Sequence, residues 1–300
     1  MKRVYITLGT RVVSEGIKPE DKGDLIILDL DSKKVLQHIT LKGRDNIKRG
    51  RSRGPAGLAF FEDYLYVATR GDLIALDPVT LKEDHYIDLL FQGVHQIKSH
   101  GGLLHLSTMI RNLKQLVKNR KVIDIVPTIY SGIGSDILPG GYFNALDFSP
   151  SGEEYHQYGG KKEIWNISKN KLVYTDTISQ APHDICFLDE ENLLYTRSIE
   201  REVIKLHIPS SKAEVVFRPP CIIQSDPNHE SNFSGFLRGI ALSKTQAFIL
   251  SNPATLYIVD LVTWQIQDTV IFLEYDLPKE EIRQRCPFDI ILDPNDWREI

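Results

Sequence analysis

The chain has 300 residues, of which 42% are hydrophobic and 25% are charged, and its formal net charge is −4. This composition supports a sizeable core, and the slightly acidic charge balance argues against a nucleic-acid coat protein. No apolar run approaches the ~18 residues of a membrane span. The start MKRVYITLG lacks a signal-peptide pattern, and three cysteines without a Cys-x-x-Cys pair indicate a reducing compartment. We therefore expect a cytoplasmic protein without nucleic-acid or membrane partners.

The N-terminal segment predicts three β-strands, RVYITLGTR, GDLIILDLDS and KVLQHITL. After it the chain repeats one unit, in which a short apolar strand is followed by a tight polar turn and further strands, with Asp, Asn, Gly and Ser at the turns. Four-stranded units at this spacing are typical of the blades of a β-propeller. The five internal units begin at Pro55, Val94, Phe143, Pro182 and Leu237.

The two ends of the chain complement each other. CPFDIILDPNDW, residues 286–297, has the form of a first strand with nothing after it, whereas the N-terminus supplies second, third and fourth strands without a first. Joined, they form one blade, and a ring closed in this way leaves no exposed sheet edge around the axis. We therefore predict an all-β, six-bladed propeller with four-stranded blades, as one domain over 1–300. The expected blades are 286–297 with 1–41, 55–90, 93–128, 142–178, 182–217 and 236–273.

The first strand of each blade should line a central channel, and all first strands should start at one face. A water-filled channel mouth accepts polar groups that a packed core would exclude. The alignment of strand starts therefore predicts which side chains surround the mouth. The first column contains Phe288, Ala56, His95, Asn144, His183 and Arg238, and the next contains Asp289, Gly57, Gln96, Ala145, Asp184 and Gly239.

Arginines gather near the same predicted rim, at the ends of second strands and in the loop KGRDNIKRGRSRG, residues 42–54. The planar donor fork of arginine suits carboxylate, phosphate or sulfate, so we expect a small anionic ligand at this face. The alternative is that the loop is simply a solvated run of charge. Three further long loops, 127–142, 218–236 and 274–286, should converge on the same mouth. The predicted ligand-binding arginines are Arg11, Arg70, Arg111, Arg197 and Arg238.

The polar residues at the mouth allow more than one chemistry. A neutral histidine could act as a general base while an arginine stabilises an oxyanion, or both histidines could make only structural hydrogen bonds. Imidazole suits Zn, Mn or Fe, and amide and carboxylate oxygens suit Ca or Mg. No GxxxxGK[ST] or GxGxxG motif is present, so we expect no nucleotide cofactor. The residues that could hold a divalent metal are His95, Asn144, His183 and Asp289.

Two blade starts, FNALDFSPSGEEYHQYG and PHDICFLDEENLLYTRS, resemble repeats of the six-bladed gluconolactonase/senescence-marker and streptogramin-lyase-like propellers. In the gluconolactonase group an Asn and an Asp head two such strands as metal ligands, and the resemblance implies Asn144 and His183 at those positions. The third ligand of that group is a Glu, where this chain offers Phe288 and Asp289, so the match fails or shifts there. The lyase-like group uses histidines and a carboxylate with magnesium, to which His95 and His183 are similar.

Two functions therefore remain open. The first is a small-molecule-processing enzyme, a hydrolase, lyase or isomerase with or without a metal, that acts on an anionic substrate at the channel mouth. Its predicted reacting centre is His95, His183 and Asn144. The second is a non-catalytic propeller that binds a protein or a sugar-phosphate ligand through its basic face.

Overall fold

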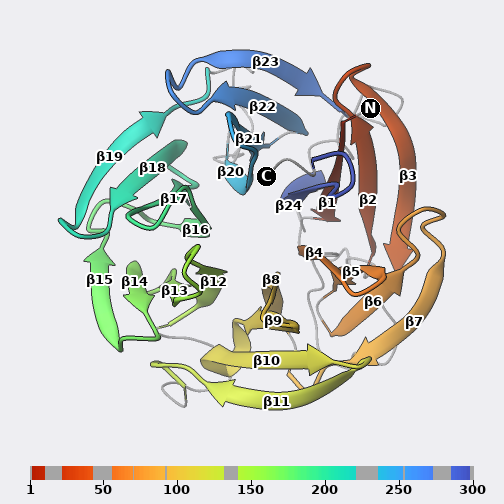
Figure 1. The fold of residues 1–300 in the computed structure, drawn as a ribbon, viewed down its shortest axis with the longest axis horizontal. Helices are drawn as coiled ribbons and strands as arrows, with labels where there is room; N and C mark the ends of the chain where they lie inside the picture. The colour runs from red at the N-terminus through yellow and green to blue at the C-terminus, as the bar shows by residue number, and fades with distance from the viewer. Residues whose placement is uncertain are drawn as a thin grey trace, which may run out of the picture.

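The computed structural model of the chain describes residues 2–10, 22–42, 56–69, 71–91, 93–131, 141–220, 236–252, 254–272 and 285–297. Within these ranges 24 strands form six four-stranded antiparallel sheets arranged around a common centre (Figure 1). This arrangement confirms the six-bladed β-propeller. The described chain contains a single short 3₁₀ turn, Ile110–Asn112, and offers no apolar helix of bilayer-spanning length.

The first blade is built from both termini. Strand β24 (Arg285–Leu292) pairs antiparallel with β1 (Arg3–Thr10), and Ile6 lies opposite Ile290. Strands β2 (Lys22–Asp29) and β3 (Lys34–Lys42) complete this sheet. The predicted closure of the ring is therefore confirmed.

The other five blades each follow the chain order, from the innermost strand to the outermost (Figure 1). Their bounds are β4 (Gly57–Phe61), β5 (Tyr64–Ala68), β6 (Asp72–Leu76) and β7 (Glu83–Asp88) in blade 2; β8 (Val94–His100), β9 (Leu103–Thr108), β10 (Leu113–Lys118) and β11 (Lys121–Pro127) in blade 3; β12 (Phe143–Phe148), β13 (Glu154–Tyr158), β14 (Glu163–Asn166) and β15 (Lys171–Thr175) in blade 4; β16 (Pro182–Phe187), β17 (Asn192–Arg197), β18 (Glu202–His207) and β19 (Lys212–Phe217) in blade 5; and β20 (Leu237–Leu242), β21 (Gln246–Ser251), β22 (Thr255–Asp260) and β23 (Ile266–Ile271) in blade 6.

The core lies between neighbouring blades. Successive side chains of a strand point to opposite faces of its sheet, so Val4 and Ile6 of β1 pack against Phe248 of blade 6. Tyr5, between them, packs against Leu65 of blade 2. The middle strands of blade 2 are covered on both faces, and their sequences YLYVA and DLIAL are apolar almost throughout rather than alternating.

The six inner strands lie next to one another around the axis, in the order β24, β4, β8, β12, β16, β20. Strand β4 pairs with β5 in continuous register, but each of the other inner strands carries a β-bulge near its N-terminal end. A bulge leaves one residue without a register partner and can redirect its side chain. The residues at these bulges are Phe288, His95, Asn144, Asp184 and Gly239.

The bulges differ from the alignment of strand starts in two blades. That alignment placed His183 and Arg238 in one column with His95, whereas the bulges of blades 5 and 6 fall one residue later, on Asp184 and Gly239. Asp184 has φ 48°, in the left-handed region, and its carboxylate accepts a hydrogen bond from the Gly239 backbone N–H of the next blade. The cross-blade bond holds Asp184 in a backbone conformation that few non-glycine residues adopt.

Candidate functional site

Two of the predicted residues, His95 and His183, meet at the axis. Their rings stack with centroids 5.4 Å apart and an interplanar angle of 23°. They belong to blades 3 and 5, so the contact passes over blade 4. His183 is buried, at 8% exposed, and His95 is half-buried.

His183 is held firmly by blade 5. Its Nδ1 lies 3.0 Å from the Ala181 carbonyl oxygen and 2.8 Å from Ser198 Oγ. On another side its ring makes an edge contact with Phe236, with centroids 5.7 Å apart. These contacts restrict both the rotation of the ring and its displacement.

Arg238 continues the same surface. Its guanidinium lies over two rings, 5.1 Å from the centroid of Phe236 and 4.6 Å from that of Phe288. Cation–π contacts of this kind fix a guanidinium without using its N–H donors. We call the resulting group the axial cluster, and its members are His95, His183, Phe236, Arg238 and Phe288.

Asn144, the third predicted catalytic residue, connects blades 4 and 5. Its Nδ2 donates a hydrogen bond to the Pro182 carbonyl oxygen at 2.9 Å, and the residue is 6% exposed. A Cβ on Gly159 would lie 2.2 Å from that nitrogen, so glycine is needed at 159 to leave room for the amide. Asn144 thus holds the backbone immediately before His183.

A second polar layer ties the blades together beside the cluster. Gln96 Nε2 donates to Asp184 at 3.1 Å, while Gln96 Oε1 accepts from the Leu146 backbone N–H at 3.0 Å. Asp289 accepts from the Leu58 and Ile290 backbone N–H groups, each at 2.9 Å. Gln96 and Asp289 thus join inner strands of different blades through side-chain hydrogen bonds.

The charges along the axis are unequal in number. Lys98 Nζ lies 3.8 Å from Asp147, and its charge interacts with those of Asp147, Asp184 and Asp289, while the Arg238 guanidinium also interacts with Asp184. Burial opposes the charge of Lys98, but the carboxylates outweigh it and raise the Lys98 pKa. Burial also raises the pKa of Asp184 and raises that of Asp289 to about 7. The axis therefore favours retention of a proton among its carboxyls.

The four residues predicted to hold a metal do not meet as one donor group. Both oxygens of Asp289 accept backbone N–H groups, and the Asn144 amide nitrogen is directed at Pro182. Across the described ranges, no group of three or more His, Cys, Asp or Glu side chains has an arrangement that could bind a metal. The divalent ion therefore stays a prediction, and we derive no reaction step through one.

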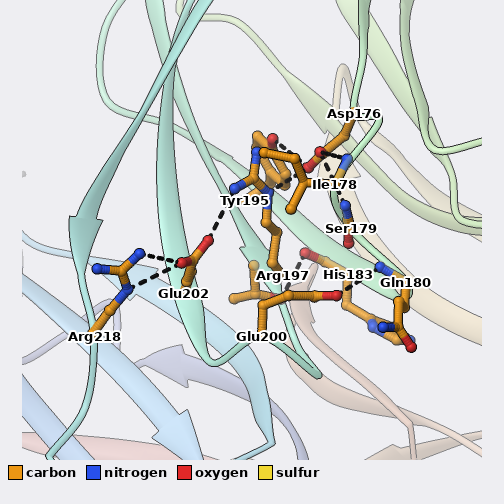
Figure 2. A network of polar contacts seen from close by, with 11 residues as sticks. Asp176, Ile178, Ser179, Gln180, His183, Tyr195, Arg197, Glu200, Glu202 and Arg218 are labelled. Carbon is orange, nitrogen blue, oxygen red and sulfur yellow. Dashed lines mark hydrogen bonds and ion pairs between the residues drawn. The ribbon is translucent and has the colours of Figure 1, made fainter.

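Arg197 lies at the end of β17 and belongs to a buried ion network (Figure 2). Its Nε donates to Asp176 at 2.7 Å and its Nη1 to Glu202 at 2.9 Å, and Glu202 also pairs with Arg218. Burial opposes the charge of Arg197, but the two carboxylates raise its pKa. Because its guanidinium is used within blade 5, we do not include Arg197 in the proposed ligand site.

The remaining predicted arginines are placed as follows. Arg111 is exposed, has φ 64°, and lies over the ring of Phe91 at 5.7 Å from the centroid. Arg11, Arg70 and the stretch 43–54 of the basic loop lie outside the described residues. Arg238 is therefore the predicted arginine that the structure brings to the histidine pair.

Several residues of the site were not predicted from the sequence. Phe236, two positions before Arg238, supplies a ring contact to both Arg238 and His183. Ser198 binds the His183 ring from the far end of β17. Extending the alignment by two columns would have found the group around Lys98, since Lys98 lies in the fourth column of that alignment, as do Asp147 and Cys186.

No protein-family model matches the chain, and no curated protein is similar to it in sequence. Solved structures are similar in fold. A protein of unknown function from Bacteroides caccae has a TM-score of 0.62 at 12% identity, covering 97% of this chain and 99% of its own. A chain of a nidogen/laminin complex has a TM-score of 0.63 at 11% identity, covering 96% and 98%. Virginiamycin B lyase from Staphylococcus aureus has a TM-score of 0.52 at 12% identity, covering 76% and 72%. At these identities the likeness shows the propeller fold alone.

Proposed function

We propose that the protein binds a small organic anion at the axial cluster and processes it by proton transfer. The observation that carries this proposal is the stacked pair His95 and His183, together with the Arg238 guanidinium, which lies over the rings of Phe236 and Phe288. The planar donor fork of an arginine suits a carboxylate or phosphate.

The chemistry follows from the residue types. Arg238 binds the anionic group of the substrate, and a neutral imidazole accepts a proton from a carbon acid or from water. The resulting imidazolium returns that proton to the leaving group or to another atom of the substrate. Hydrolysis, elimination and isomerisation all use this pair of transfers. Asn144 and Ser198 act through His183 as positioning residues.

A lyase among the proteins of similar fold supports an elimination as the first reaction class to test. The support is one of architecture, since similar folds host many unrelated activities. The divalent metal stays a prediction, and elemental analysis of the purified protein tests it without reference to activity.

The test begins with a thermal-shift screen of mono- and dicarboxylates, sugar phosphates and other phosphate esters. A ligand at a hundred times its dissociation constant adds about 2.7 kcal/mol to stability, which shifts the melting temperature measurably. The stabilising anions are then incubated with wild type and followed by NMR for turnover. We expect His183→Ala to remain folded and to lose turnover, whereas Arg218→Met, an exposed arginine of blade 5, retains it. Full turnover by His183→Ala would overturn the proposed centre.

A non-catalytic binding role is the second candidate. The nidogen/laminin chain matches nearly the whole propeller, and two predicted site residues, Asn144 and Arg197, make contacts within the protein. Anion binding that depends on Arg238, without turnover of any stabilising compound, would favour this role over the enzyme.

A further inference from the structure

The hydroxyl groups around His183 form an ordered chain of hydrogen bonds. Thr196 Oγ1 donates to the backbone carbonyl oxygen of His183 at 2.9 Å and lies 3.3 Å from Ser198 Oγ. Ser198 Oγ in turn lies 2.8 Å from His183 Nδ1. Thr196 and Ser198 are both fully buried, so their hydroxyl protons must be used within this group.

The direction of each bond follows from what each atom can do. A carbonyl oxygen only accepts, so the contact between His183 Nδ1 and the Ala181 oxygen requires the proton on Nδ1. The Thr196 hydroxyl donates its proton to the His183 carbonyl oxygen. In its contact with Ser198, Thr196 Oγ1 is therefore the acceptor and the Ser198 hydroxyl is the donor. Ser198 Oγ is then an acceptor toward His183 Nδ1–H. If Nδ1 carried no proton, its lone pair would face the lone pairs of the Ala181 carbonyl oxygen, and the contact would be repulsive instead of a hydrogen bond.

We infer that Ser198 and Thr196 are positioning residues that hold neutral His183 as its Nδ1–H tautomer, which makes Nε2 the proton-accepting nitrogen. This inference deepens the proposed function and rests on it for the role of Nε2 in catalysis. The partner of a histidine's other nitrogen commonly selects the tautomer. Here that partner is a neutral hydroxyl and a carbonyl rather than a carboxylate.

Blade 3 shows that the arrangement is not a general feature of the repeat. Thr108 pairs with Val94 as Thr196 pairs with His183, but the Thr108 hydroxyl donates to the Leu113 carbonyl oxygen within its own blade. In blade 3 the Ser107 hydroxyl donates to the carbonyl oxygen of its paired residue Gln96, so the feature that distinguishes blade 5 is the contact of a hydroxyl with a histidine ring.

The experiment is a long-range ¹H–¹⁵N correlation spectrum of the full chain labelled with ¹⁵N-histidine, recorded at slightly alkaline pH. Comparison with His183→Gln assigns the His183 signals among the nine histidines. We expect a protonated Nδ1 and a bare Nε2 in wild type. In Ser198→Ala and Thr196→Val, we expect the two nitrogen shifts to move toward each other as the other tautomer becomes populated. Ser243→Ala, a buried serine of a turn in blade 6, should leave the signals unchanged.

A protonated Nε2 in wild type would overturn the inference, and no variant has to fold for that result. Unchanged His183 shifts in both hydroxyl variants would remove Ser198 and Thr196 from this role. The spectrum requires no substrate, so its outcome is distinct from that of the turnover assay. Loss of the proposed function would leave the tautomer assignment standing, and the reverse also holds.

Discussion

Two histidines of neighbouring regions are buried to similar degrees and used differently. His156, between blades 3 and 4, has both ring nitrogens bound within the protein, Nε2 by Glu154 and Nδ1 by the Tyr158 hydroxyl at 3.1 Å. Glu154 is also bound by Lys114 Nζ at 2.6 Å. His183 instead has neutral partners at Nδ1 and stacks on the half-buried His95. The difference indicates that His156 stabilises an interface, while His183 stays the residue that we propose for the ligand site.

Two arginines show the same contrast. Arg197 is paired with Asp176 and Glu202 inside blade 5, whereas Arg238 lies between aromatic rings on the axial cluster. Arginines paired with buried carboxylates contribute to folding, and removal of either partner leaves a buried charge. The Arg238 guanidinium instead contacts two aromatic rings. Burial or proximity to the axis alone does not separate the two roles.

The largest expected effect is on the His156 region. Glu154→Ala removes the carboxylate that binds the buried Lys114 ammonium and His156, so we expect a loss of about 3–5 kcal/mol in the free energy of unfolding. His183→Ala should cost only about 1 kcal/mol, because its lost partners are neutral. Urea unfolding of both variants measures the difference, with the exposed Glu214→Ala as a control. Equal losses for Glu154→Ala and His183→Ala would break the comparison.

For the two arginines we expect a somewhat smaller difference in the loss of unfolding free energy than for Glu154→Ala and His183→Ala. Arg197→Met leaves the buried Asp176 without its guanidinium, although Glu202 keeps Arg218, and we expect a loss of about 3 kcal/mol. Arg238→Met removes cation–π contacts worth about 0.5–1 kcal/mol each. Thermal or urea unfolding compares the two variants side by side. A larger loss in Arg238→Met would show that Arg238 is the structural arginine.

The axial carboxyls and Glu154 predict changes of opposite sign in the free energy of unfolding as the pH rises. Burial raises the pKa of Asp289 to about 7, so the folded state holds a proton that the unfolded state releases near pH 4. The contribution of Asp289 to stability is therefore complete below pH 4 and is lost as the pH rises to 7. In contrast, Lys114 and His156 hold the pKa of Glu154 at about 2 against the effect of burial, and its contribution is lost as the pH falls below 4.5.

Comparison of the free energy of unfolding of wild type with that of Asp289→Asn between pH 4 and 8 isolates the pH-dependent contribution of Asp289. The wild type should lose stability relative to the variant over that range. Asp296→Asn serves as a control, because its pairing with Arg3 lowers the Asp296 pKa and confines its effect to more acidic solutions. A wild-type-minus-Asp289→Asn difference that is constant with pH would contradict a shared proton at the axis.

The closure of the ring and the meeting of His95 with His183 were accessible from the sequence. Complementary strand fragments at the termini and aligned strand starts were sufficient for both, because blade topology repeats along the chain. The position of each bulge was not accessible. Asp184 takes a left-handed conformation because Gln96 and Gly239 of other blades bind its carboxylate, and no local pattern encodes those partners.

The direction of Arg197 was equally inaccessible. Thr196-Arg197 has the same local sequence whether the guanidinium faces the axis or the interior of the blade. Asp176 and Glu202, 21 and 5 residues away, decide between the two directions. Side chains near the axis are therefore predictable by position, while their roles depend on partners that only the packed blades bring together.

The most direct test of the account is the affinity of the axial cluster for the anion that stabilises the wild type most in the thermal-shift screen. Isothermal titration should show a loss of at least about 10-fold in Arg238→Met, since a hydrogen bond to a charged group contributes about 1.5–3 kcal/mol. Arg218→Met, which removes an exposed arginine, should bind within about 2-fold of wild type. Equal affinities in all three proteins, or no stabilising anion at all, would contradict an anion site at the propeller axis.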